Sequence, residues 1–172
     1  MLGAVVGDIV GSRFEFKNYK SKDFELFHAD CFVTDDSIMT LAVAEAIMNC
    51  QGDYTKLYDA TITSMRLIGP KYPCSGYGES FFRWLYSDRP KPYDSYGNGA
   101  AMRISPIATI ANSLAEVKKY SRAVTETTHN NSEGIKGAEA VASAIFLART
   151  GKTQEEIREY IHQYYYNLDF TL

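Results

Sequence analysis

The chain has 172 residues, of which 45% are hydrophobic and 23% are charged, and its formal net charge at pH 7 is -3. This composition is that of an ordinary globular protein, and the length suits one domain, residues 1–172, with a substantial core. The acidic balance and the lack of any Lys/Arg run argue against binding to nucleic acid.

The spacing of the cysteines and the N-terminal sequence indicate a cellular compartment. Cys31, Cys50 and Cys74 lie far apart without C-x-x-C spacing, so neither a disulfide framework nor a zinc knuckle is expected. The first residues carry no basic leader, and Asp8 interrupts their apolar stretch. No apolar run approaches the roughly 20 residues that span a bilayer. We therefore expect a cytoplasmic protein that does not enter a membrane.

The spacing of glycine and apolar residues predicts the first two helices. Gly3, Gly7 and Gly11 recur at i, i+4 and i+8, which predicts a helix with a side-chain-free stripe on which another helix could pack. Because glycine costs about 1 kcal/mol per helical site, such a stripe needs a packing purpose. The second expected helix begins at Thr34 and turns four residues inward: Ile38, Leu41, Ala42 and Ile47.

Helical periodicity continues to the end of the chain. A third helix is expected from the Asp53 cap to Gly69 and Pro70, and a short fourth lies in "GYGESFFRWLYS" before a loop rich in proline and glycine. Later helices are expected over about residues 105–114, 117–128, 133–149 and 155–165, the last with a capping box of Thr153 and Glu156. No segment alternates over strand length, so the fold class is all-α.

Two adjacent aspartates, Asp35 and Asp36, open the second helix in "TDDSIMTLAVAEAI". Acids at a helix start commonly satisfy free backbone N–H groups. One acid would serve, however, and Thr34 is already a good cap. Two neighbouring carboxylates repel each other unless water, a basic side chain or a hard cation lies between them. The pair is thus either a cap or part of a metal site.

Three further motifs carry polar groups. "GDIVGSRFE" holds Asp8 and Glu15, "SYGNGAAMR" places glycines at a helix start where backbone N–H groups can face an anion, and "THNNSEGIKGAEA" holds His129. Each also has a purely structural interpretation. Asp8 suits a carboxylate bonded to nearby backbone, Glu15 a solvated acid, the glycines a tight turn and His129 a loop histidine or cap.

Taken in order, the four motifs resemble those of the ADP-ribosylglycohydrolase family. The resemblance implies a compact all-helical fold with two magnesium ions, sometimes manganese, in a cleft. It also implies hydrolysis of the glycosidic bond between ADP-ribose and an acceptor such as arginine or serine. The expected partners are an ADP-ribosylated protein or a small molecule that contains ADP-ribose.

The resemblance assigns roles residue by residue. Thr34, Asp35 and Asp36 match a metal-ligand motif, and Glu15 matches the acid near the metals and the scissile bond, so Glu15 and Asp35 are the expected catalytic residues. The loop that holds the ribose and diphosphate corresponds to Ser95, Tyr96, Gly97, Asn98 and Gly99, and His129 corresponds to a histidine that contacts the ligand.

The family's second acidic motif, D-x-D-T near the C-terminus, has no counterpart because the sequence contains no D-x-D. The resemblance therefore covers the N-terminal portion of the family fold, and the fold is expected to be truncated at its C-terminus, with a partial metal shell. The chain is then an enzyme completed by another polypeptide, a non-catalytic ADP-ribose binder, or a self-assembling helical protein.

An aromatic stripe runs along the last helix. Tyr160, Ile161, Tyr164 and Tyr165 recur at helical spacing, and Phe170 and Leu172 follow. The stripe either packs on the chain's own core or forms a homodimer or partner contact.

Overall fold

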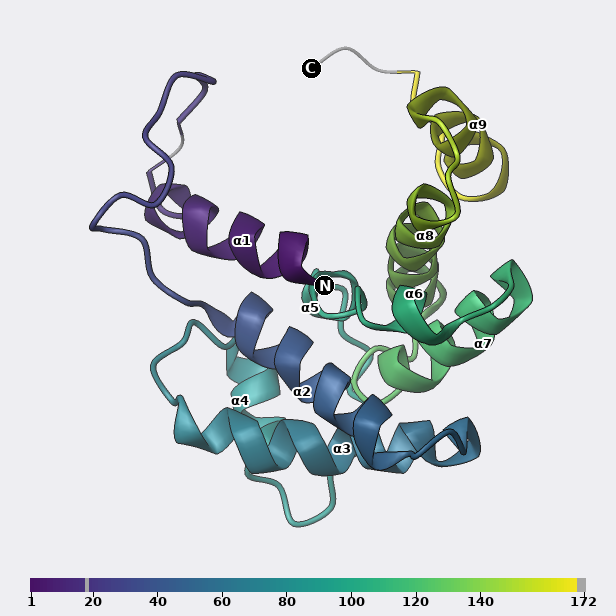
Figure 1. Cartoon of the computed structure of the whole chain (residues 1–172). Coiled ribbons are helices and arrows are strands. Elements are labelled where there is room, and N and C mark those ends of the chain that lie inside the picture. The colour runs from purple at the N-terminus through teal and green to yellow at the C-terminus, as the bar shows by residue number, and fades with distance from the viewer. Residues whose placement is uncertain (18, 170–172) are drawn as a thin grey trace.

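The computed structural model describes residues 1–17 and 19–169, which contain helices and no strand. Figure 1 shows the helices α1 (Leu2–Gly11), α2 (Asp35–Asn49), α3 (Leu57–Ile68), α4 (Glu79–Leu85), α5 (Gly99–Met102), α6 (Ile107–Ile110), α7 (Leu114–Thr125), α8 (Ser132–Arg149) and α9 (Gln154–Tyr164). The all-α expectation is confirmed. None of the helices in these two ranges is long and apolar enough to cross a membrane.

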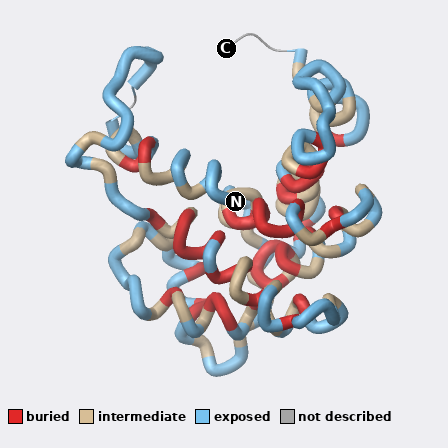
Figure 2. Tube along the Cα trace, viewed as in Figure 1, coloured by how far each residue is buried: buried red, intermediate tan, exposed pale blue. Residues whose placement is uncertain are grey.

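The core forms where α2–α8 meet, and α1 with the loop that follows it is largely exposed (Figure 2). α2 packs on α3, α7 packs on α8, and α5 and α6 also lie against α8. Two apolar clusters fill these contacts. Val43 of α2 joins one with Leu57 and Ile104, and Met39 of α2 joins the other with Trp84. α2 therefore connects the two halves of the core.

One inward assignment on α2 is wrong. Leu41 is 47% exposed, whereas Ile38 and Ala42 are buried. The buried apolar positions of α2 are 38, 39, 42, 43 and 46, which occupy a single helical face. Leu41 lies outside this face, so its apolar side chain points to solvent.

The expected ends of two helices are confirmed. Asp53 accepts a hydrogen bond from the Thr55 backbone N–H in the turn that leads into α3. At the start of α9, the Thr153 hydroxyl accepts from Glu156 N–H, and the Glu156 carboxylate accepts from Thr153 N–H at 2.8 Å. Both N-termini thus have their free donors satisfied by side chains.

The single helix expected over residues 105–114 is wrong, because only Ile107–Ile110 is helical there. Ser113 caps α7 by accepting from the Glu116 N–H, and the Glu116 carboxylate accepts from the Asn112 N–H at 2.8 Å. This reciprocal cap makes residue 114 the first of α7 and leaves Ala111 extended. The helix expected over residues 117–128 is found as α7 over Leu114–Thr125.

No described residue packs on the glycine stripe of α1. A Cβ atom added at Gly3, Gly7 or Gly11 would have no described heavy atom within 4 Å, so the expected helix contact is not found in the described part of the chain. Gly7 and Gly11 instead border a pocket beside Asp8 and Glu15. The missing side chains leave this pocket open.

The aromatic stripe of α9 packs in part on the rest of the fold. Tyr165 is buried, and its hydroxyl lies 3.2 Å from that of Ser143 on α8. The ring of Tyr160 lies 4.7 Å from that of Tyr164, which remains 55% exposed. Phe170 and Leu172, expected to extend the stripe, lie outside the described residues.

Two leucines on α3 test the core. Leu57 is fully buried and Leu67 is 54% exposed. We expect Leu57→Ala to lower the free energy of unfolding by about 2 to 5 kcal/mol through the cavity it leaves. Leu67→Ala should change it by less than about 0.5 kcal/mol, since surface substitutions rarely matter more. Urea denaturation measures both, and equal losses would contradict this core.

Candidate functional site

Asp8 fastens the start of α2 to α1. Its carboxylate accepts hydrogen bonds from the backbone N–H groups of Thr34 (3.1 Å) and Ser37 (3.2 Å), and from the Thr34 hydroxyl (2.5 Å). Free N–H groups at a helix start need such acceptors. Asp8 is thus a carboxylate bonded to backbone, and it fixes the segment that carries Asp35 and Asp36.

The acids at this junction oppose one another's ionisation. Burial raises the pKa of Asp35 to about 6, helped by the charges of Asp36, Glu15 and Asp8 and opposed by a backbone hydrogen bond. Burial also raises the pKa of Asp36, and the charges of Asp8 and Glu15 add to this effect. Such a group of carboxylates gains stability from a cation.

The expected site residues line two adjoining pockets. The first, called the carboxylate pocket below, has a volume of about 340 Å³ and is bordered by Glu15, Thr34 and Asp36. The second, called the loop pocket, has a volume of about 470 Å³ and is bordered by Asp35, residues 95–99 and His129. Asn98 borders both. Segments from Glu15 to His129 therefore meet at one place.

The donors of the carboxylate pocket suit a hard divalent cation, which prefers carboxylate and hydroxyl oxygens. Thr34 and Asp36 would hold it together with Asp35, which borders the adjoining loop pocket, and Glu15 lies nearby. However, nowhere in residues 1–17 and 19–169 do three or more His, Cys, Asp or Glu side chains gather at the spacing of a metal centre. The donor chemistry fits a metal ion, and the described side chains would supply only part of its shell.

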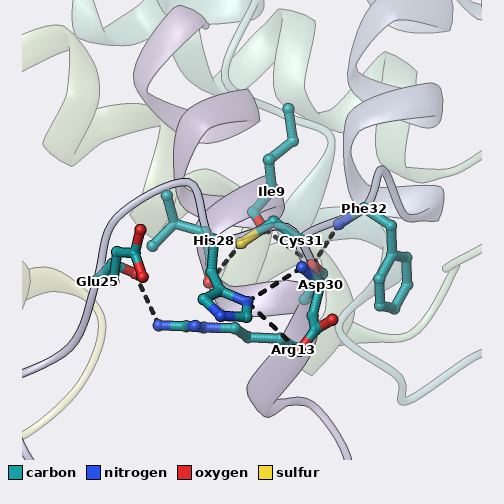
Figure 3. A network of polar contacts seen from close by, with 9 residues as sticks. Ile9, Arg13, Glu25, His28, Asp30, Cys31 and Phe32 are labelled. Carbon is teal, nitrogen blue, oxygen red and sulfur yellow. Dashed lines mark hydrogen bonds and ion pairs between the residues drawn. The ribbon is translucent and has the colours of Figure 1, made fainter.

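Hydrogen bonds to backbone groups hold the segment between Glu15 and α2 (Figure 3). The Arg13 guanidinium donates to the carbonyl of Glu25 at 2.7 Å, and Cys31 N–H donates to the carbonyl of His28 at 2.9 Å. Near its end the Phe32 N–H donates to the Ser12 hydroxyl at 2.9 Å. These bonds return the chain to α1 and leave Glu15 beside the carboxylate pocket.

The loop over residues 93–97 is anchored by the segment before α8. Asn130 Oδ1 accepts from the Asp94 N–H at 2.8 Å, and Asn131 Nδ2 donates to the Ser95 carbonyl at 2.5 Å. Both asparagines lie in the motif "THNNSEGIKGAEA", and no role was expected for them. Their position directly before a helix is a signal for capping, and Asn131 does cap α8.

His129 is neutral and bonded on both sides. Its Nε2 lies 3.1 Å from the Gly97 carbonyl, which can only accept, so Nε2 carries the proton and Nδ1 accepts from the Thr128 hydroxyl at 2.7 Å. Burial, with the charge of Arg103 second, lowers its pKa to about 4, although the Gly97 bond opposes this. These bonds show that His129 positions the loop, and its contact with a ligand stays a prediction.

Arg103 is the residue that the sequence analysis missed. It borders the loop pocket but is only 1% exposed, and its Nη2 donates to the hydroxyls of Thr128 (2.7 Å) and Thr127 (3.4 Å). No ion pair joins it to a described carboxylate. Burial lowers its pKa to about 10, so it stays charged at neutral pH. A buried positive charge therefore lies beneath the loop.

Comparison with known proteins shows which family the chain resembles. Residues 1–169 match the ADP-ribosylglycohydrolase family. Relatives include the ADP-ribosylhydrolase ARH3 of Danio rerio, which is 32% identical over 88% of this chain and 47% of the fish protein. The ARH3 of Mus musculus is 28% identical over 91% of this chain and 50% of the mouse protein.

The chain belongs to the ADP-ribosylglycohydrolase family. A shorter stretch of 62 residues is 42% identical to the ARH3 of Gallus gallus. The chain spans about half the length of the curated relatives it matches.

The effect of Arg103 on His129 can be measured directly. Arg103→Gln removes the charge while keeping a hydrogen-bond donor, so we expect the pKa of His129 to rise from about 4. It should remain below its ordinary value because burial persists. NMR titration of the imidazole C–H resonances reports the value, and His162 on α9 serves as an internal control. An unchanged His129 pKa would show that Arg103 does not act on it.

Proposed function

We propose that this chain is an ADP-ribosyl hydrolase domain that holds an ADP-ribose unit across the carboxylate and loop pockets and cleaves its glycosidic bond with a divalent metal ion. The observation that supports it best is the position of Asn98, which borders both pockets. A ligand in contact with Asn98 can reach the carboxylates with one end and the loop above Arg103 with the other.

The charges suit each part of the ligand. Cleavage of a ribosyl bond builds positive charge on the ribose, which the acidic end stabilises. Glu15 and Asp35 would move protons to and from water and the leaving group. When bound, magnesium or manganese would orient and acidify the attacking water. The buried guanidinium of Arg103 balances the diphosphate, which residues 95–99 hold.

The partial metal shell favours a second candidate. Hydrolysis is expected to need carboxylates that the described residues do not supply, so the chain alone would bind ADP-ribose without cleaving it. A homodimer or a complementing chain would contact the aromatic tail, where the ring of Tyr164 on α9 is exposed. The free thiols of Cys31, Cys50 and Cys74 suit a reducing cytoplasm.

Binding and turnover separate these candidates. Calorimetric titration with ADP-ribose, with and without Mg²⁺, should show binding that Mg²⁺ strengthens. Arginine- and serine-ADP-ribosylated peptides then test hydrolysis, and sedimentation over a wide concentration range tests for a dimer. Binding without turnover would favour the second candidate. If ADP-ribose did not bind at all, both would be contradicted.

The acidic pair gives a second test. In Asp35→Asn with Asp36→Asn, we expect Mg²⁺ to lose its effect on the melting temperature, because the metal's ligands are gone. The metal-free variant should be more stable at pH 7 by about 1 kcal/mol after allowance for solvent screening, since two mutually repelling charges are removed.

The raised pKa of Asp35 predicts how the stability of the metal-free fold changes with pH. The pKa of Asp35 is about 6 in the fold and 3.8 ordinarily, so ionised Asp35 destabilises the metal-free fold above pH 6. As the pH falls from 6 to 3.8, Asp35 is protonated in the folded state before it is protonated in the unfolded state. The stability gained by the Asp35 and Asp36 double variant should therefore shrink over this range. The control Asp23→Asn with Asp88→Asn removes two exposed acids and should keep the Mg²⁺ response. A double variant that still responded to Mg²⁺ would leave the pair as a helix cap only.

A further inference from the structure

A third pocket, called the cationic pocket, lies beside the loop pocket. Its volume is about 420 Å³, and it is bordered mainly by basic and aromatic residues: Ser80, Arg83, Trp84, Arg89, Lys91 and Tyr93. None of them was an expected site residue, and the family motifs lie outside this segment. Neither the carboxylates nor the glycine loop forms part of it.

The three pockets follow one another in a row. Asn98 borders the carboxylate pocket and the loop pocket. Ser80 and Tyr93 border the loop pocket and the cationic pocket. The carboxylate and cationic pockets share no residue. The cationic pocket therefore stands at the far end of a series of adjoining pockets, called the trough below, whose near end holds the acids.

The cationic pocket carries a net positive charge. Arg83 is paired with Glu79 across one helical turn of α4. Neither Arg89 nor Lys91 forms an ion pair with a carboxylate among the described residues. Two positive charges thus face this pocket without a described counter-charge, in a protein whose net charge is -3.

The segment that presents these charges is held in place. Arg66 of α3 donates to the carbonyls of Leu85, at 3.1 Å, and Ser87. The Ser87 hydroxyl accepts from the Arg89 N–H at 3.2 Å. Lys91 lies between two prolines in "RPKP", which restricts its backbone. A fixed backbone lowers the entropy lost when a ligand is bound.

The charge of the cationic pocket and its position in the trough indicate which ligand group it binds. Arginine and lysine together in a concave site suit a phosphate group, which takes paired guanidinium donors and a point charge. An acceptor peptide leaves at the acidic end of the trough, so its side chains would not extend to the other end. The ligand atoms nearest the cationic pocket would belong to the adenosine.

We propose that the cationic pocket binds a phosphate group carried on the adenosine end of the ligand, so that this chain prefers an ADP-ribose unit with an additional phosphate there. The orientation of the ligand rests on the proposed function, whereas binding of an anion by the pocket does not. A preference of this kind concerns the end of the substrate away from the reacting bond.

The test compares ADP-ribose with ADP-ribose 2′-phosphate by calorimetry. We expect the phosphorylated ligand to bind roughly fivefold to twentyfold more tightly, as one charge-assisted phosphate contact at a partly exposed site would give. Arg89→Gln with Lys91→Gln should remove this difference and leave the affinity for ADP-ribose unchanged. Lys119→Gln with Lys152→Gln removes the same net charge elsewhere and should keep the difference.

Equal affinity of the two ligands for the unmodified chain would overturn the inference and leave the proposed function intact. If neither ligand bound, the proposed function would fail, and inorganic pyrophosphate would then decide about the pocket. Trp84 is the only tryptophan and borders the pocket, so its fluorescence reports occupancy.

A change in Trp84 fluorescence on addition of pyrophosphate that disappears in the Arg89 and Lys91 variant would support an anion site. The anion site would be overturned if pyrophosphate left the fluorescence unchanged, or changed it equally in the unmodified chain and the variant. A fluorescence response to an acidic peptide alone would also overturn it. The response should weaken as salt is added, because exposed charges are screened.

Discussion

The hydrogen-bond chain from Arg103 through Thr128 and His129 to Gly97 supports the rest of the site. A fully buried guanidinium is costly to desolvate, and here hydroxyl acceptors and an aromatic face, rather than a carboxylate, surround it. Burial, with the charge of Arg103 second, lowers the pKa of His129 and keeps the ring neutral, so that one ring nitrogen accepts and the other donates. The Gly97 carbonyl is thereby fixed, and with it the loop that borders both pockets of the candidate site.

α2 links this loop to the acids. Its middle turns lie in both apolar clusters, so its axis is set by core packing. Its first turn is set by Asp8, which binds two N–H groups there and leaves the side chains of Asp35 and Asp36 directed to the pockets. Because the glycines at 7 and 11 add no side chains, the carboxylate pocket stays open beside them. Rigid packing on one face of α2 and open space at its start thus give a fixed group of acids.

The order of charges along the trough is a property of the whole fold. Acids from α1 and α2 lie at one end, the buried charge of Arg103 lies under the middle, and the exposed charges of Arg89 and Lys91 lie at the other end. An extended ligand with a cationic transition state at one end and phosphates along its length complements this order. The net charge of the chain does not reveal such an arrangement, since the opposite charges cancel in the sum.

Much of the architecture was predictable from local chemistry. Periodicity and caps placed α2, α3, α8 and α9, and the four motifs identified the segments that meet at the site. Prediction failed where a competing cap decided the outcome, as at Ser113, and where the choice of a helical face depended on neighbours, as at Leu41. The glycine stripe of α1 was expected to receive a helix, and the described part of the chain offers none.

Periodicity and motif spacing are local properties, so the helical class and the residue types available for chemistry follow from the amino-acid sequence alone. Three features needed the folded chain: Asp8 accepts hydrogen bonds from the start of α2, His129 carries its proton on Nε2, and Arg103 is buried beneath the loop. Each of these depends on partners distant in the chain, and burial and hydrogen bonding are set by such partners rather than by neighbouring residues.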